Sequence, residues 1–120
     1  LIANKLWSTV LASVSVMFSQ IRGEESWVTK EKDGFKVNGH TAEGLSGSAK
    51  DALGAAIRCT LMRTFLPQCG LLILDEPCAA MSEERTESML GFLKSVDFQQ
   101  TLLVSHEEVS ESIADNLIQL

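Results

Sequence analysis

The sequence predicts an α/β fold in which helices pack on a parallel sheet. Two short apolar runs, LLIL at 71–74 and TLLVS at 101–105, are typical of strands that are buried on both faces. Between them, residues 83–96 have helical periodicity, with acidic residues in the first turn. Because a strand, a helix and a strand follow one another, we expect a right-handed crossover between parallel strands.

The first half of the chain predicts a helix, a hairpin and a second helix. Apolar residues recur at three- and four-residue spacing over 2–19, which indicates an amphipathic helix. Residues 26–38 hold short extended runs around a Lys-Asp-Gly turn and end at an Asn-Gly, which predicts a β-hairpin. A second helix is predicted over residues 49–66, before Pro67. Its apolar residues at four-residue steps are Leu53, Ile57, Leu61 and Phe65.

The rest of the chain continues the alternation of helices and strands. In the helix over 83–96, Met89, Leu90 and Leu93 are expected to face inward. Residues 107–115 predict a short helix, and 116–120 a final strand. A length of 120 residues is typical of one globular unit.

Composition limits the class of protein. A net charge of −6 argues against an electrostatic grip on nucleic acid along the whole chain. No apolar run reaches the length of about 20 residues that spans a membrane, and no secretory signal pattern opens the chain. We therefore expect a cytoplasmic protein. Cys59, Cys69 and Cys78 form no CxxC pair, so they are expected to be reduced packing residues.

Polar side chains follow both predicted strands. Asp75 and Glu76 come directly after LLIL, and His106 follows the next strand. Because ligands of parallel sheets bind beyond the carboxyl ends of the strands, these residues form a candidate site. One carboxylate can hold Mg²⁺, the other can deprotonate a water that attacks a phosphate, and the histidine can reach that phosphate. The alternative is that the two acids only begin a turn and that His106 only caps a helix.

Three motifs resemble a known family. LLILDEP at 71–77 looks like the Walker B strand of ABC-type ATPases, LLVSHE at 102–107 like their switch-histidine segment, and LSGSAK at 45–50 like their signature. The insert TFLPQCG at 64–70 and the lysine at position 50 resemble the SMC-like, SbcC-type ATPases of double-strand-break repair more than transporter ATPases.

The resemblance implies a fold and a division of the chain. The fold would be the C-terminal lobe of an ABC-type P-loop ATPase head, a parallel sheet with flanking helices. Within this single lobe, residues 1–22 would be the returning arm of a coiled coil and 23–42 the β-hairpin. Residues 43–120 would carry the signature, Walker B and switch-histidine core.

The resemblance also implies roles for single residues in an ATPase that uses ATP and Mg²⁺. Glu76 would be the catalytic base, His106 would contact the γ-phosphate, and Asp75 would support Mg²⁺ directly or through water. In a dimer of heads, the signature would contact the ATP held by the other head. The residues in that contact would be Ser46, Gly47 and Ser48 of the signature and Ser82 of the D-loop.

The chain has no intact GxxxxGK[ST] phosphate loop. The closest match, GLSGSAKD at 44–51, is open to interpretation as a decayed phosphate loop, but Asp51 stands where a hydroxyl should bind Mg²⁺. Under the preferred interpretation an N-terminal lobe supplies the phosphate loop, and this chain is inactive alone. The other implied partners are a second head, a nuclease subunit and DNA, with no membrane, in the cytoplasm or at the nucleoid.

The signature and the D-loop depart from the family pattern. Ser48 replaces the usual second glycine, Ala49 the usual Gln or Glu, and Met81 and Ser82 the usual Leu-Asp pair. Two other functions therefore stay open. One is an SMC-like clamp or docking module that binds nucleotide with little turnover, and the other is the ATPase of a membrane transporter.

Overall fold

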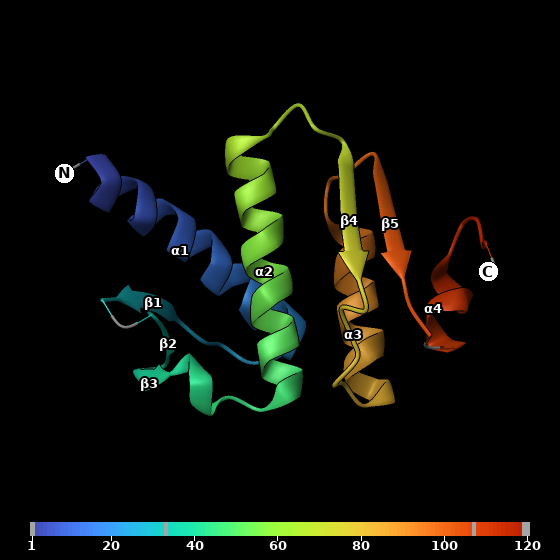
Figure 1. Cartoon of the computed structure of the whole chain (residues 1–120), viewed down its shortest axis with the longest axis horizontal. Coiled ribbons are helices and arrows are strands. Elements are labelled where there is room, and N and C mark those ends of the chain that lie inside the picture. The colour runs from blue at the N-terminus through green and yellow to red at the C-terminus, as the bar shows by residue number, and fades with distance from the viewer. Residues whose placement is uncertain (1, 33, 107, 119–120) are drawn as a thin grey trace.

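The structure is a computed structural model that describes residues 2–32, 34–106 and 108–118. A helix and three short strands come first, and from residue 47 onward helices and strands alternate, as expected for the predicted α/β class (Figure 1). In chain order they are α1 (Ile2–Arg22), β1 (Val28–Glu31), β2 (Gly34–Val37), β3 (His40–Thr41), a 3₁₀ turn (Ala42–Gly44), α2 (Gly47–Phe65), β4 (Leu71–Asp75), α3 (Glu83–Ser95), β5 (Gln100–Val104) and α4 (Glu108–Ile113).

Two helices, α1 and α2, form the centre of the core. α1 crosses α2 at an angle and packs against it through its C-terminal half (Figure 1), and α1 also contacts α3. The predicted apolar face of α1 is buried from Val10 onward, whereas Leu6 is exposed. The prediction for α2 was only partly correct, because Leu53 is buried but Phe65 is exposed. The deeply buried residues of α2 are small, which lets the helices approach closely: Ala52, Ala56, Cys59 and Thr60.

The predicted hairpin is present and carries a third short strand. β1 pairs with β2, and β2 pairs with β3, both antiparallel. The turn between β2 and β3 uses Asn38 and Gly39, whose φ angles are +52° and +84°. Positive φ at both central residues is typical of the type I′ hairpin turn that an Asn-Gly pair favours.

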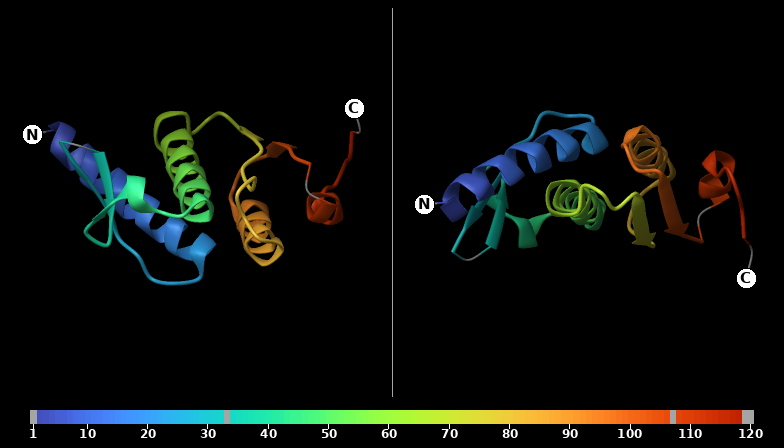
Figure 2. Two further views of the ribbon diagram at one scale, coloured as in Figure 1. Left: turned by 60° about the horizontal axis from the view of Figure 1, so that its bottom comes forward. Right: turned by 90° about the horizontal axis from the view of Figure 1, so that it is seen from above.

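Two strands form the parallel sheet. β4 pairs with β5 in a register that sets Asp75 opposite Val104. Helix α3 lies over one face of these strands (Figure 2), and Leu72 and Leu74 are buried on the inner side. The predicted burial of both faces is wrong for this chain, since no described element covers the outer face. Its exposed side chains are Leu71, Ile73, Leu102 and Val104.

The C-terminal segment differs from its prediction. The short helix is present as α4, but residues 116–118 form no strand, and 119–120 lie outside the described residues. The inward positions predicted for α3 are correct, because Met89, Leu90 and Leu93 are all buried. Among the described helices, none has both the length and the apolar character needed to cross a membrane.

Candidate functional site

The candidate site begins where β4 ends. Asp75 is the last residue of β4, and its side chain is exposed. The backbone amide of Glu76 donates to the carbonyl of Val104 at 2.7 Å, which extends the pairing with β5 by one residue. The chain then turns sharply, because Glu76 has a φ of +49°. A left-handed conformation costs a residue other than glycine about 1–2 kcal/mol, and such strain is typical of functional sites.

Glu76 and His106 meet at this edge of the sheet. The Nε2 atom of His106 lies 3.1 Å from Oε1 of Glu76. The His106 side chain is 92% exposed, whereas the Glu76 side chain is only 29% exposed. The structure thus brings together the two residues that the sequence placed at the ends of successive strands.

The Oε1 atom of Glu76 keeps its capacity to accept a hydrogen bond. This atom is buried, and no described group donates a hydrogen bond to it. Although His106 lies within ion-pair distance, the contact lacks the geometry of a hydrogen bond. Because Oε1 is buried while the side chain as a whole is 29% exposed, a water would approach Glu76 at the exposed part of the side chain and not at Oε1.

Asp75 supplies a single carboxylate for a metal ion. Within the described part of the chain, no three His, Cys, Asp or Glu side chains gather closely enough to hold a metal by themselves. One carboxylate at a strand end nevertheless fits Mg²⁺, which proteins often bind through one or two carboxylates together with the phosphates of a nucleotide. The donor set therefore fits a magnesium nucleotide better than a structural metal.

The predicted signature residues form the start of α2. Ser46 is the N-cap, and its Oγ accepts a hydrogen bond from the amide of Ala49 at 3.2 Å. Gly47 and Ser48 begin the first turn, where free amides and the helix dipole favour an anion. A 3₁₀ turn precedes this segment instead of a buried strand. The structure therefore does not support a decayed phosphate loop, which would follow a strand.

The predicted signature adjoins the segment that follows the predicted Walker B strand. The Asp51 carboxylate accepts a hydrogen bond from the amide of Ala80, with Oδ2 and N 3.0 Å apart. Ser82 is the N-cap of α3 and accepts from the amide of Arg85 at 3.2 Å. The start of α2 is thus joined to the predicted D-loop. No local sequence pattern marks this role of Asp51, because its partner lies 29 residues away along the chain.

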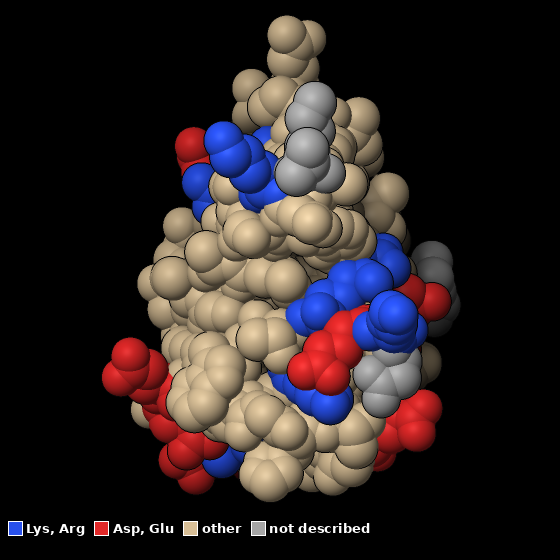
Figure 3. Space-filling view, turned by 90° about the vertical axis from the view of Figure 1, so that its left-hand side faces the viewer, with Lys and Arg blue, Asp and Glu red and all other residues tan. Residues whose placement is uncertain are grey.

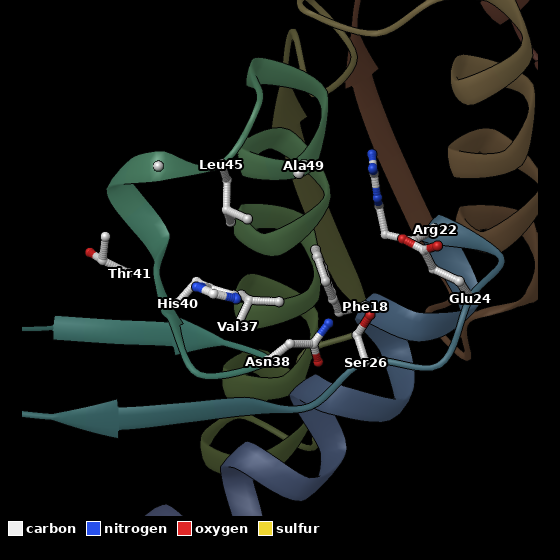
Figure 4. A pocket seen from close by; sticks show the side chains of 11 residues that line it. Phe18, Arg22, Glu24, Ser26, Val37, Asn38, His40, Thr41, Leu45 and Ala49 are labelled. Atoms are coloured by element: carbon white, nitrogen blue, oxygen red, sulfur yellow. The ribbon is translucent and has the colours of Figure 1, made fainter.

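A hollow of about 530 Å³ lies on the hairpin side of the signature (Figure 4). The end of α1, the hairpin and the loop before α2 form its walls. Leu45 borders it, but Glu76 and His106 do not. The hollow is therefore separate from the carboxyl edge of the sheet.

Charges of both signs are mixed on the face that bears the hairpin and the start of α1 (Figure 3). Lys36 pairs with Glu31 there at 2.7 Å. Lys30 lies 5.2 Å from the ring centre of Trp7. This face does not present a continuous basic surface for a nucleic-acid backbone.

Comparisons with known proteins identify relatives among ATPases. No protein-family profile matches the chain. The chain is 31% identical over 85 residues to the DNA double-strand break repair Rad50 ATPase of Methanococcus maripaludis, which is 70% of this chain and 9% of the relative. It is 37% identical over 78 residues to the Rad50 ATPase of Pyrococcus abyssi, which is 63% of this chain and 9% of the relative. The chain thus spans about a tenth of the length of these relatives.

The transport system ATP-binding/permease protein CydD of Escherichia coli also matches, with 33% identity over 69 residues, or 57% of this chain and 11% of the relative.

Two solved structures with similar folds are both SMC head domains. The SMC head domain from Thermotoga maritima matches with a TM-score of 0.66 and 20% identity, covering 88% of this chain and 40% of that one. An SMC head bound to the C-winged helix domain of ScpA matches with a TM-score of 0.69 and 15% identity, covering 92% of this chain and 38% of that one.

Proposed function

This chain is a C-terminal piece of an SMC/Rad50-like ATPase head, and we propose that it supplies half of an ATP site that works between two engaged heads. One head would hold ATP by its phosphate loop, and the signature of the other head would contact the same ATP. ATP then joins the two heads, and its hydrolysis separates them.

The observation that carries this proposal is the contact between Glu76 and His106. Glu76 would act as the general base, taking the proton of the attacking water at the solvent-accessible part of its side chain, which is 29% exposed although Oε1 is buried. His106, 3.1 Å from Oε1, would contact the γ-phosphate. Asp75 would bind Mg²⁺ directly or through water, and the ion would neutralise charge on the phosphates.

The signature and the D-loop would form the surface that meets the other head. Ser46, Gly47 and Ser48 lie at the start of α2, where an anion is stabilised by amide groups and by the helix dipole. Ser82 lies at the start of α3 on the adjoining segment. The hydrogen bond between Asp51 and Ala80 supports the idea that these two segments act as one unit.

An N-terminal lobe would complete the head and supply the phosphate loop. The outer face of β4 and β5 supports this, since Ile73 is 48% exposed and Leu102 is 46% exposed. Apolar side chains in such numbers on one sheet face are typical of a surface that another part of a protein covers. Without that lobe the chain would not hydrolyse ATP.

We further propose that the head serves DNA repair or recombination in the cytoplasm or at the nucleoid, without a membrane role. The role in DNA repair is supported by the two Rad50 relatives, which are described as ATPases of DNA double-strand break repair. In that setting α1 would be the returning arm of a coiled coil, and a nuclease subunit would be the partner. The SMC head bound to a domain of ScpA supports the general point that heads of this fold take protein partners.

The test is ATP hydrolysis by this chain mixed with its N-terminal lobe, with and without DNA. We expect turnover only when both lobes are present. Glu76→Gln should lower the turnover rate about 100-fold to 10⁴-fold, which is the usual effect of removing a general base. Glu87→Gln is the matched control, because Glu87 lies exposed on α3. Equal turnover in Glu76→Gln and the parent would contradict the assignment of the base.

A nucleotide-gated clamp is the second candidate function, supported by the unusual residue Ser48 in the signature. A clamp would bind ATP and join heads, but the mixture of lobes would show no turnover above that of Glu76→Gln. Sedimentation of the mixture with and without ATP separates this outcome from a protein that does not bind ATP.

A further inference from the structure

The ends of three helices meet beside the signature. α1 ends at Arg22, α2 begins at Gly47 and α3 begins at Glu83. The guanidinium of Arg22 donates to the hydroxyl of Ser48, with Nη1 and Oγ 3.1 Å apart. Arg85, in the first turn of α3, donates to the carbonyl of Arg22 at 2.9 Å. Two hydrogen bonds therefore join the end of α1 to both segments that we propose for the surface facing the second head.

The bond to Ser48 depends on a residue that departs from the family pattern. A glycine at position 48 would offer no side-chain acceptor to Arg22. The serine hydroxyl instead gives the first turn of α2 a partner on α1. Gly23 ends α1 directly after Arg22 with a φ of +75°, which leaves the terminal carbonyl open to Arg85.

The arrangement concentrates positive charge behind the signature. Burial lowers the pKa of Arg22, and the neighbouring Arg85 lowers it further, while Glu24 acts in the opposite direction. The carboxylate of Glu24 lies near the base of the Arg22 side chain, and the guanidinium points away from it (Figure 4). The start of α2 adds the positive end of its dipole to the same region, where the negative end of the α1 dipole opposes it. An anion in front of the first turn of α2 would offset the repulsion between Arg22 and Arg85.

We infer that Arg22 is a positioning residue for the contact between the signature and the ATP of the second head. It holds Ser48, and with it the first turn of α2, and it ties that turn to the end of α1. A displacement of α1 would then reach the signature directly. The inference rests on the proposed function, since that function supplies the anion, and it makes Ser48 a functional part of this signature.

The test is a double-mutant cycle in the protein assembled from both lobes, with the ATP concentration that half-saturates turnover as the readout. Arg22→Ala and Ser48→Ala should each raise it about tenfold, as expected for a hydrogen bond to a charged donor near the surface. The double variant should be no worse than either single one. In a Ser48→Gly background, which has no acceptor, Arg22→Ala should have no further effect. Arg22→Lys should recover part of the loss.

Arg63→Ala is the matched control, because Arg63 is exposed near the far end of α2, and it should leave the readout unchanged. Additive effects of Arg22→Ala and Ser48→Ala would overturn the inference. If the parent protein shows no ATP turnover, amide hydrogen exchange over residues 47–50, measured without nucleotide, tests the link between Arg22 and Ser48 instead. Faster exchange in both single variants, without further increase in the double variant, supports positioning by Arg22 even if the proposed function fails. Unchanged exchange overturns it.

Discussion

Gly47 and Ala80 are so close that a Cβ atom built on Gly47 would lie 2.8 Å from the Cβ of Ala80. Gly47 belongs to the predicted signature, and Ala80 precedes Ser82 of the predicted D-loop. No real Cβ contact is this short, and a Cβ atom cannot rotate away as the end of a long side chain can. The two segments therefore fit together only with small residues at both positions.

Gly47→Ala should lower the free energy of unfolding by about 1–3 kcal/mol, as overpacking of a close contact does. Chemical denaturation measures this change. Ala80→Gly added to Gly47→Ala should restore part of the loss, because it removes the opposing methyl group.

Gly54→Ala on the same helix is the control. A Cβ at position 54 meets no atom within 4 Å, so this change should raise the stability by about 0.5–1 kcal/mol through helix propensity. If Gly47→Ala is as stable as Gly54→Ala, the close contact between the two segments does not exist in solution.

Asp51→Ala should weaken the same contact between the start of α2 and the segment around Ala80, because it removes the carboxylate that joins them. The amide of Ala80 would lose its acceptor at 3.0 Å, and the cost should be about 1 kcal/mol because the bond is near the surface. Asp51→Asn keeps one side-chain oxygen and should cost less. Denaturation gives the stability, and hydrogen exchange at Ala80 gives the local effect. A cost for Asp51→Asn as large as that for Asp51→Ala would mean that charge, and not the acceptor oxygen, matters.

Sequence patterns predicted much of the fold for a physical reason. Burial along a helix repeats with the helical period, so α1 and the inward face of α3 follow from apolar spacing. The meeting of Glu76 and His106 follows from the rule that parallel strands end at one edge. Their roles in catalysis remain predictions.

Other features depend on contacts that no local pattern records. Alanines such as Ala52 and Ala56 do not stand out as an apolar stripe, although they are fully buried in α2. The hydrogen bonds between Arg22 and Ser48 and between Ala80 and Asp51 cross 26 and 29 residues of chain. The exposure of Ile73 could not be predicted either, because it depends on what covers the strand and not on the strand itself.

Cys59 should make the stability depend on pH in the alkaline range. Burial raises the pKa of its thiol from 9.0 to about 11, and Arg63 and Arg58 only partly offset this. Because the folded state favours the neutral thiol, its contribution is complete below pH 9 and is lost as the pH rises towards 11. The free energy of unfolding should fall over this window.

Cys59→Ala should remove the part of this pH dependence that the thiol causes. The comparison is between the slopes of the free energy of unfolding against pH in the two proteins, and not between their absolute stabilities. A thiol reagent at neutral pH should modify the exposed Cys69 well before the buried Cys59 and Cys78. Identical slopes in the parent and Cys59→Ala would show that this thiol is not protected by the fold.

Ile73→Lys should weaken the assembly of the two lobes while sparing the fold of this chain. Ile73 is 48% exposed on the outer face of β4, so the lysine can reach water in the chain alone, and the stability should change by no more than about 0.5 kcal/mol. In the assembled head the same lysine would lose its hydration against an apolar partner, and the dissociation constant should rise about tenfold or more. Calorimetric titration of one lobe with the other measures this.

Val16→Lys is the matched control, because Val16 is also an exposed branched residue, 59% accessible, and lies on α1. If it weakens assembly as much as Ile73→Lys does, the effect comes from added charge and not from the sheet face. Unchanged assembly in Ile73→Lys would mean that the N-terminal lobe lies elsewhere, so that the exposed apolar face would need a different partner to explain it.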